Sequence, residues 1–185
     1  MTKKYELVLD DTISFWGWKL FRIRALISFG SVEVGDLGGY IEKEENLSHD
    51  GNAWVSGNAK VSGDAKVSGN AWVSGNAKVS GDAKVSGDAE VSGDAKVSGD
   101  AKVSGDAEVW GNAEVSELGD IIVFKNHWSS GRHFTYTKSN KMWKVGCFYG
   151  TGQELIEKAY RDSEKSGNYY KAYVDFVENL EKLGD

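Results

Sequence analysis

The longest regular pattern in the chain is a hexapeptide repeat. From Gly51 to Ser116, eleven six-residue units follow one another without insertion, each with Ala and Val two positions apart. Residues two apart lie on the same side of an extended segment, so Ala and Val are expected to point inward and the residue between them outward. The Gly-Asn or Gly-Asp pair that opens most units supplies a corner, because these residues tolerate positive φ. A short fixed period of this kind predicts a solenoid.

The outward residue between Ala and Val carries a second period, of 18 residues. It reads Trp, Lys, Lys in the first three units and again in the next three, then Glu, Lys, Lys, and finally Glu, Glu. Three units therefore make one turn. The pattern predicts a mostly β protein, with a three-sided parallel β-helix over residues 32–116 whose interior is filled by Val and Ala.

The segment before the repeats, residues 1–31, has a different pattern. Phe21, Ile23 and Ala25 alternate with charged residues after a turn at Gly17. Alternation of this kind indicates strands. We predict an N-terminal β cap, since an open solenoid end would expose unpaired strand groups.

The segment after the repeats, residues 117–185, is predicted to form a small α+β module. Its apolar runs predict three strands, at 121–124, 134–138 and 142–148. Thr151 and Glu154 have the spacing of a capping box, which predicts the start of a helix. Ser166, Gly167 and Asn168 are expected to separate it from a second helix.

Composition narrows the class of protein. The chain has 185 residues, 40% of them apolar, and a net charge of −6. This is enough apolar material for one compact domain, or one with a small appendage. The single Cys147 cannot form an internal disulfide, which favours a reducing cytoplasm. No stretch reads as a membrane span or an export signal, and the negative charge argues against general nucleic-acid binding.

One stretch of the C-terminal module suggests a binding site. Between Asp120 and Glu154 there is no acidic residue, and basic side chains alternate with aromatic ones. This mixture suits an anionic ligand or an acidic protein surface. The alternative is that the aromatic residues form the core and the charges a solvated face. The candidate residues are Lys125, His127, Trp128, Arg132, His133, Lys138, Lys141, Trp143 and Lys144.

A second candidate surface lies on the repeats. Trp54, Trp72 and Trp110 are predicted to share one face, and three exposed tryptophans would be costly to leave in water. Either the flanking segments cover them, or they form an interface with a partner or a second subunit. The lysine columns on the other faces are expected to be solvated and salt-bridged. We expect no metal site and no cofactor.

The repeat units carry a resemblance to a known family. Units such as VSGDAK resemble the hexapeptide-repeat family of left-handed parallel β-helices, which implies a left-handed coil. Residues 32–55 resemble the first coil of phage-carried and prophage-carried relatives that are labelled acyltransferases. The stretch GCFYGTGQELIEKAY, residues 146–160, resembles a module that follows repeat arrays in phage proteins.

The acyltransferase activity that this resemblance suggests is not the preferred reading. Such enzymes use a histidine base at the coil surface, a loop projecting from the helix and a neighbouring subunit. Residues 51–116 contain no histidine and no inserted loop, so only His49, in a bulge before the array, could be a base. A coenzyme A-dependent acyltransferase therefore remains an alternative, as does a structural spacer or virion component.

The preferred hypothesis is a non-catalytic, phage-type binding protein. In this hypothesis a rigid β-helix carries the basic-aromatic module, which binds a host protein or an anionic small molecule. Small phage proteins of this kind often act on a host factor, which suggests an inhibitor of a host defence system that acts in the host bacterial cytoplasm. Homo-oligomerisation is left open, since related helices often trimerise.

Overall fold

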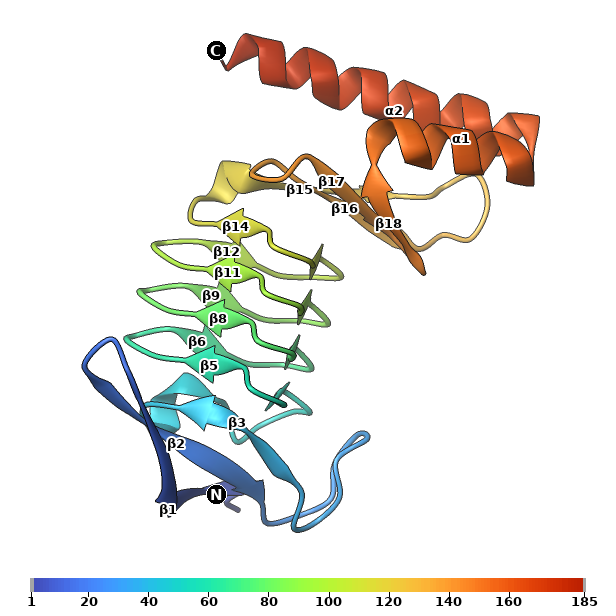
Figure 1. Ribbon diagram of the computed structural model, residues 1–185. Coiled ribbons are helices and arrows are strands. Elements are labelled where there is room, and N and C mark those ends of the chain that lie inside the picture. Colours follow the sequence, from blue (N-terminus) through green and yellow to red (C-terminus); the bar gives the residue numbers. More distant parts are fainter. Residues whose placement is uncertain (1, 185) are drawn as a thin grey trace.

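The computed structural model describes residues 2–184 and is a β-solenoid of about four turns, preceded by strands and followed by two helices (Figure 1). The N-terminal strands lie at one end of the solenoid and the two helices at the other (Figure 1). Met1 and Asp185, the predicted outer limits of the cap and the module, lie outside the described residues.

The interior of the solenoid is the one that the repeat predicts. Every Ala and Val of the array is at most 1% exposed, and together they form one continuous core. Each unit contributes a two-residue strand. The strands are β4 (Trp54–Val55), β5 (Lys60–Val61), β6 (Lys66–Val67), β7 (Trp72–Val73), β8 (Lys78–Val79), β9 (Lys84–Val85), β10 (Glu90–Val91), β11 (Lys96–Val97), β12 (Lys102–Val103), β13 (Glu108–Val109) and β14 (Glu114–Val115).

The strands pair in parallel with strands 18 residues away, as Trp54 does with Trp72. The ladders run β4-β7-β10-β13, β6-β9-β12 and β5-β8-β11-β14, and strand β3 (Leu37–Ile41) extends the last of these. The hydrogen bonds that flank each two-residue strand donate toward the next coil: the N–H of Lys60, for example, donates to the carbonyl of Ala77 at 2.9 Å. At these positions the first coil presents carbonyl groups and the last coil presents N–H groups.

The N-terminal segment supplies hydrogen-bond donors to the first coil. Strand β3 (Leu37–Ile41) pairs with β5, and it is joined to the antiparallel hairpin of β1 (Tyr5–Phe15) and β2 (Trp18–Ala25). Lys4 Nζ donates to the carbonyl of Ala53 at 2.8 Å, and Asn46 Nδ2, from the short helix η1 (Glu44–Asn46), donates to that of Ala65 at 2.9 Å. Both side chains are buried. They cap two corners, while β3 caps the side between them.

The C-terminal segment supplies acceptors to the last coils. Thr135 Oγ1 accepts from the N–H of Glu108 at 2.9 Å, and Ser139 Oγ accepts from that of Glu114 at 2.8 Å. A carboxylate oxygen of Asp120, at the end of the short helix η2 (Leu118–Asp120), accepts from the N–H of residue 116 at 2.7 Å. The module is thus hydrogen-bonded directly onto the solenoid.

The module itself is a four-stranded antiparallel sheet in the order β15-β16-β17-β18. Strands β15 (Ile121–Lys125) and β16 (His133–Thr137) lie where the sequence predicts strands. The predicted strand at 142–148 is wrong in extent, because two strands, β17 (Met142–Val145) and β18 (Phe148–Thr151), meet there at a tight turn. Gly146 has φ +54 and allows the chain to reverse.

Two helices pack on this sheet, and α1 (Gly152–Asp162) begins at the predicted capping box of Thr151. The predicted break at 166–168 is wrong. Helix α2 (Glu164–Leu183) starts earlier, where the side chain of Ser163 accepts from the N–H of Ser166. Gly167 lies inside α2 because Tyr160 packs on it: a Cβ there would meet the Tyr160 ring at 2.2 Å.

The tip of the β1–β2 hairpin yields a prediction about stability. Trp16 and Gly17 have φ +49 and +83, the conformation of a type I′ turn, in which Asn is favoured and β-branched residues are strained. Both Trp16→Asn and Trp16→Thr remove the stacking on Phe15. We expect the Asn variant to be more stable than the Thr variant by about 1 kcal/mol in urea denaturation. Equal stabilities would contradict this reading of the turn.

The capping of the last coils yields a second prediction. Thr135 is fully buried, so Thr135→Val leaves the Glu108 N–H without an acceptor and should cost about 1–3 kcal/mol in the free energy of unfolding. Ser139→Ala is the matched control, because its bond to Glu114 is exposed and water can replace it. We expect the control to change stability by less than about 0.5 kcal/mol. A similar cost for both variants in urea denaturation would mean that burial of the cap is unimportant.

Candidate functional site

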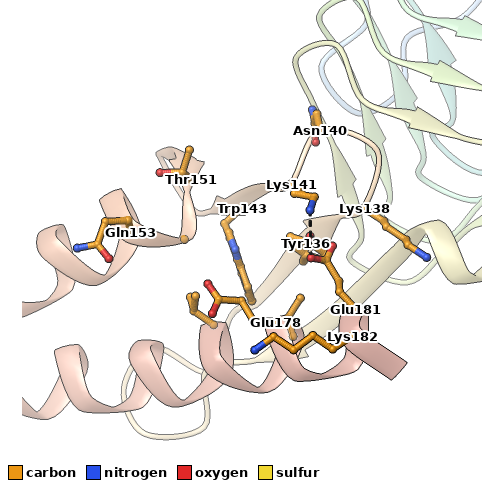
Figure 2. Close-up of a pocket in the computed structure, with 13 residues that line it drawn as sticks. Tyr136, Lys138, Asn140, Lys141, Trp143, Thr151, Gln153, Glu178, Glu181 and Lys182 are labelled. Atoms are coloured by element: carbon orange, nitrogen blue, oxygen red, sulfur yellow. Dashed lines mark hydrogen bonds and ion pairs between the residues drawn. The ribbon is translucent and has the colours of Figure 1, made fainter. Parts of the chain in front are cut away.

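A groove opens between the C-terminal sheet and helix α2 (Figure 2). It has a volume of about 680 Å³, in the range of small-ligand sites. Strands β16 and β17 supply one wall, the start of α1 closes one end, and α2 supplies the other wall. The lining residues include Tyr136, Lys138, Asn140, Lys141, Trp143, Thr151, Gly152, Gln153, Val174, Val177, Glu178, Glu181 and Lys182.

The floor of the groove is aromatic. Trp143 is 2% exposed, and its ring packs against Phe124, Phe134 and Tyr136 in the core of the module. Within residues 2–184 its indole N–H makes no hydrogen bond, although the ring borders the groove. Aromatic rings with a polar tip usually find a partner when they are buried. The groove therefore presents one unused donor from its floor.

A polar network occupies one wall. The Tyr136 hydroxyl donates to Glu181 Oε1, and Lys141 Nζ lies 3.6 Å from Glu181 Oε2. Burial, and then the hydrogen bond to Glu181, raise the pKa of Tyr136 above its usual value, so the phenol keeps its proton. Glu181 is thus partnered on both oxygens. Lys138 and Lys182 line the groove without an ion pair among the described residues.

The structure does not bring the nine predicted basic and aromatic residues into one site. Lys138, Lys141 and Trp143 line the groove, but Lys144 and His133 contact the solenoid. Lys144 is 7% exposed; its Nζ lies 2.9 Å from Glu108 Oε2 and 4.2 Å from the centre of the Trp110 ring. These two side chains hold the module in place, because His133 contacts the corner residue Asp106 and Lys144 pairs with Glu108 of strand β13.

The other predicted residues lie elsewhere on the module. Trp128 stacks on Tyr169 with ring centres 4.7 Å apart, and His127 packs edge-on against both rings. This cluster joins the loop after β15 to α2. Lys125 and Arg132 are exposed, and Arg132 borders a smaller hollow of about 280 Å³ that also includes His133 and Cys147.

The groove contains residues that the sequence did not single out. Glu178, Glu181 and Lys182 come from α2, about forty positions after the strands that they face. No local motif marks them, because only the packing of α2 onto the sheet brings them there. The capping box of Thr151 and Glu154 predicted the start of α1, which closes one end of the groove.

Trp54 and Trp72 lie on one face of the solenoid, as predicted, because they pair in register. The Trp54 side chain is 2% exposed, since Phe29 and Tyr5 pack edge-on against it from the N-terminal segment, so it leaves no surface for a partner. Trp110 is half-buried beneath Lys144, and Trp72 is half-buried against the solenoid core. The flanking segments thus cover two of the three tryptophans.

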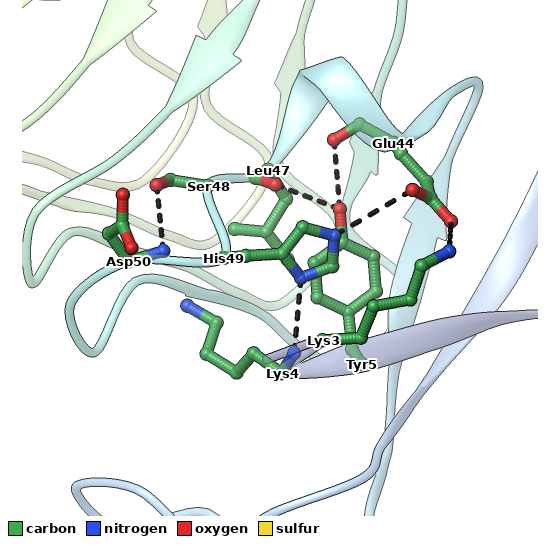
Figure 3. Close-up of polar contacts among 8 residues, drawn as sticks. All are labelled: Lys3, Lys4, Tyr5, Glu44, Leu47, Ser48, His49 and Asp50. Atoms are coloured by element: carbon green, nitrogen blue, oxygen red, sulfur yellow. Dashed lines mark hydrogen bonds and ion pairs between the residues drawn. The ribbon is translucent and has the colours of Figure 1, made fainter. Parts of the chain in front are cut away.

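His49, the candidate acyltransferase base, lies in a closed contact at the N-terminal end (Figure 3). Its Nδ1 accepts from the backbone N–H of Lys4 at 3.1 Å, and Tyr5 stacks on its ring at 4.4 Å. Its Nε2 is buried, 3.8 Å from Glu44 Oε2. A general base needs a nitrogen within reach of its substrate. This geometry instead holds the first strand against the solenoid.

Within residues 2–184 no group of three His, Cys, Asp or Glu side chains could hold a metal ion. In the same part of the chain no helix is both long and apolar enough to cross a membrane.

The fold defines the class: the chain is a β-solenoid protein with a C-terminal α+β module. No protein-family model matches the sequence, and no curated protein matches it. The groove between the C-terminal sheet and α2 is therefore the feature that bears on function.

The buried Lys4 yields a prediction about pH. Burial lowers its pKa to about 8 from 10.5, against the opposing charge of Asp50. Between pH 8 and 10.5 the unfolded chain binds a proton that the folded protein has released. The free energy of unfolding should therefore rise with pH, by at most about 1.4 kcal/mol per pH unit. Above pH 10 the raised pKa of Tyr5 acts in the opposite direction.

The measurement is the free energy of unfolding between pH 8 and 10. Lys4→Met should abolish the rise, whereas Lys3→Met, at an exposed lysine paired with Glu44, should preserve it. A wild-type curve that matches that of Lys4→Met would show that Lys4 does not titrate in this range.

Proposed function

We propose that the protein is a non-catalytic binding protein, in which the solenoid holds the C-terminal module and the groove of that module takes an anionic ligand or a segment of a host protein. The observation that carries this proposal is the groove itself. It combines an aromatic floor, an unused indole N–H and three lysines, of which only Lys141 has an ion-pair partner among the described residues. Grooves with apolar walls and a few placed polar groups are typical ligand sites.

Rigid attachment supports a display role for the solenoid. The module contacts the last coils through the Thr135 and Ser139 caps and the Lys144–Glu108 ion pair. Asn140, which lines the groove, also donates to Asn112 Oδ1 at 3.2 Å. A ligand in the groove would therefore have a fixed position relative to the solenoid.

Finer features of the fold form part of the proposal. Pairing between strands 18 residues apart supports a coil with three sides. The left hand rests on the resemblance of the repeats to left-handed hexapeptide helices. Phage origin, action in the host cytoplasm and inhibition of a host defence system rest on the same resemblance, and homo-oligomerisation is an open part of the proposal.

Native mass spectrometry of protein purified gently from a bacterial lysate tests the binding role. We expect a mass in excess of the chain or its oligomer, lost in the triple variant Lys138→Gln, Lys141→Gln, Lys182→Gln. Removing three positive charges from the groove should weaken binding of an anionic ligand at least about tenfold.

The matched control replaces Lys19, Lys102 and Lys165, exposed lysines outside the groove, with Gln. It should retain the additional mass. A ligand that survives the groove variant, or a wild-type protein that carries none, would contradict the proposal and favour a spacer role.

A further inference from the structure

We infer that the end of the groove at α1 binds the C-terminal carboxylate of a peptide or protein chain with an apolar last residue. This inference rests on the proposed binding function and names its ligand. Two kinds of donor meet at this end, the indole N–H of Trp143 and the first N–H groups of α1, while the ammonium group of Lys141 lies farther along the groove, beside Glu181 (Figure 2).

The indole N–H of Trp143 makes no hydrogen bond within the described residues. The side chain is 98% buried, and its Nε1 lies 3.3 Å from the position that a Cβ on Gly152 would take. In Figure 2 the ring lies between the start of α1 and α2. The indole nitrogens of Trp110 and Trp128 are enclosed without a partner, whereas Trp143 borders the groove, where an acceptor can reach its N–H.

The start of α1 leaves two backbone donors free beside the indole. The capping box of Thr151 and Glu154 uses their own N–H groups: Thr151 N–H donates to Glu154 Oε2 at 2.8 Å, and Glu154 N–H donates to Thr151 Oγ1 at 3.3 Å. The N–H groups of Gly152 and Gln153, the first two helical residues, have no partner within the helix. Helix starts favour anions through these groups and the helix dipole.

Glycine at position 152 keeps the two sets of donors together. A Cβ there would lie 2.7 Å from Val174 Cγ1, so it would push α2 or the indole away. The backbone does not require glycine at this point, because its φ is not positive. Close approach is therefore the reason for glycine at the helix start.

The charges of the groove favour a ligand with one negative charge over a polyanion. Lys138, Lys141 and Lys182 face Glu178 and Glu181, which leaves a single net positive charge in the lining. Glu154 also lies at the helix start and would repel a second negative charge. A carboxylate fits this balance better than a phosphate that carries close to two charges.

The walls beside the donors are apolar. Val174 and Val177 from α2 face the rings of Tyr136 and Trp143. This combination, backbone donors for a terminal carboxylate and an apolar space for the last side chain, is a recurring mode of peptide recognition. An acidic side chain has only one or two methylene groups beside its carboxylate, fewer than the apolar side chain of a terminal residue, so a chain terminus fits better.

Nuclear magnetic resonance tests the inference with N-acetyl-leucine, which reproduces an apolar chain terminus. The protein would be titrated to about 10 mM ligand, which fills most of a site with Kd near 1 mM. We expect the Trp143 indole proton, assigned with Trp143→Phe, and the Gly152 amide proton to shift downfield together. N-acetyl-leucinamide, which lacks the carboxylate, should bind at least about tenfold more weakly.

The outcomes separate the alternatives. If Trp143→Phe fails to fold, the Gly152 and Gln153 amides of the wild-type protein give the same answer. Shifts with inorganic phosphate but not with N-acetyl-leucine would overturn the carboxylate assignment, and so would equal shifts with the amide. No shift with N-acetyl-leucine, while native mass spectrometry shows a ligand lost in the lysine variant, would reject this inference and leave the proposed function standing.

Discussion

The structure depends on the polarity of its backbone ladders. At the corners of the parallel solenoid and at the ends of its strands, the N–H groups donate toward the C-terminal end, so at these positions the first coil lacks donors and the last coil lacks acceptors. Unpaired strand groups are costly when buried and invite association when exposed. The two ends of the solenoid are capped by side chains of opposite hydrogen-bonding type. Lys4 and Asn46 donate hydrogen bonds to the first coil, whereas Thr135, Ser139 and Asp120 accept hydrogen bonds from the last coils.

This division of labour explains why composition alone grouped basic residues that the fold separates. Lys144 and His133 belong to a stretch free of acidic residues, which suggested a surface for an anionic ligand. The acidic partners were supplied by the solenoid, where Asp106 and Glu108 lie within 3 Å of them. Charge counted along one segment cannot reveal ion pairs with another segment, because the fold decides which segments meet.

The same reasoning shows what the sequence could and could not predict. The six-residue period defines the buried Ala and Val positions, because each unit repeats one local geometry. The capping box likewise defines the start of α1, since Thr151 and Glu154 act within one turn. Gly167 looked like a helix break but is helical, because Tyr160 packs where a side chain would lie. The groove escaped prediction since its second wall comes from α2, which no local pattern places against the sheet.

Regularity also restricts where function can reside in such a molecule. Each repeat unit offers nearly the same side chains in the same geometry, so the array supplies a scaffold and few distinct sites. The irregular ends contain more varied side chains, but many of these are used to cap the coils or to hold the flanking segments. His49 holds the first strand, and Lys144 holds the module. At the start of α1 the Trp143 indole N–H borders the groove and makes no hydrogen bond within the described residues. Packing in the core of the module accounts for its ring, and the N–H is left for the ligand proposed above.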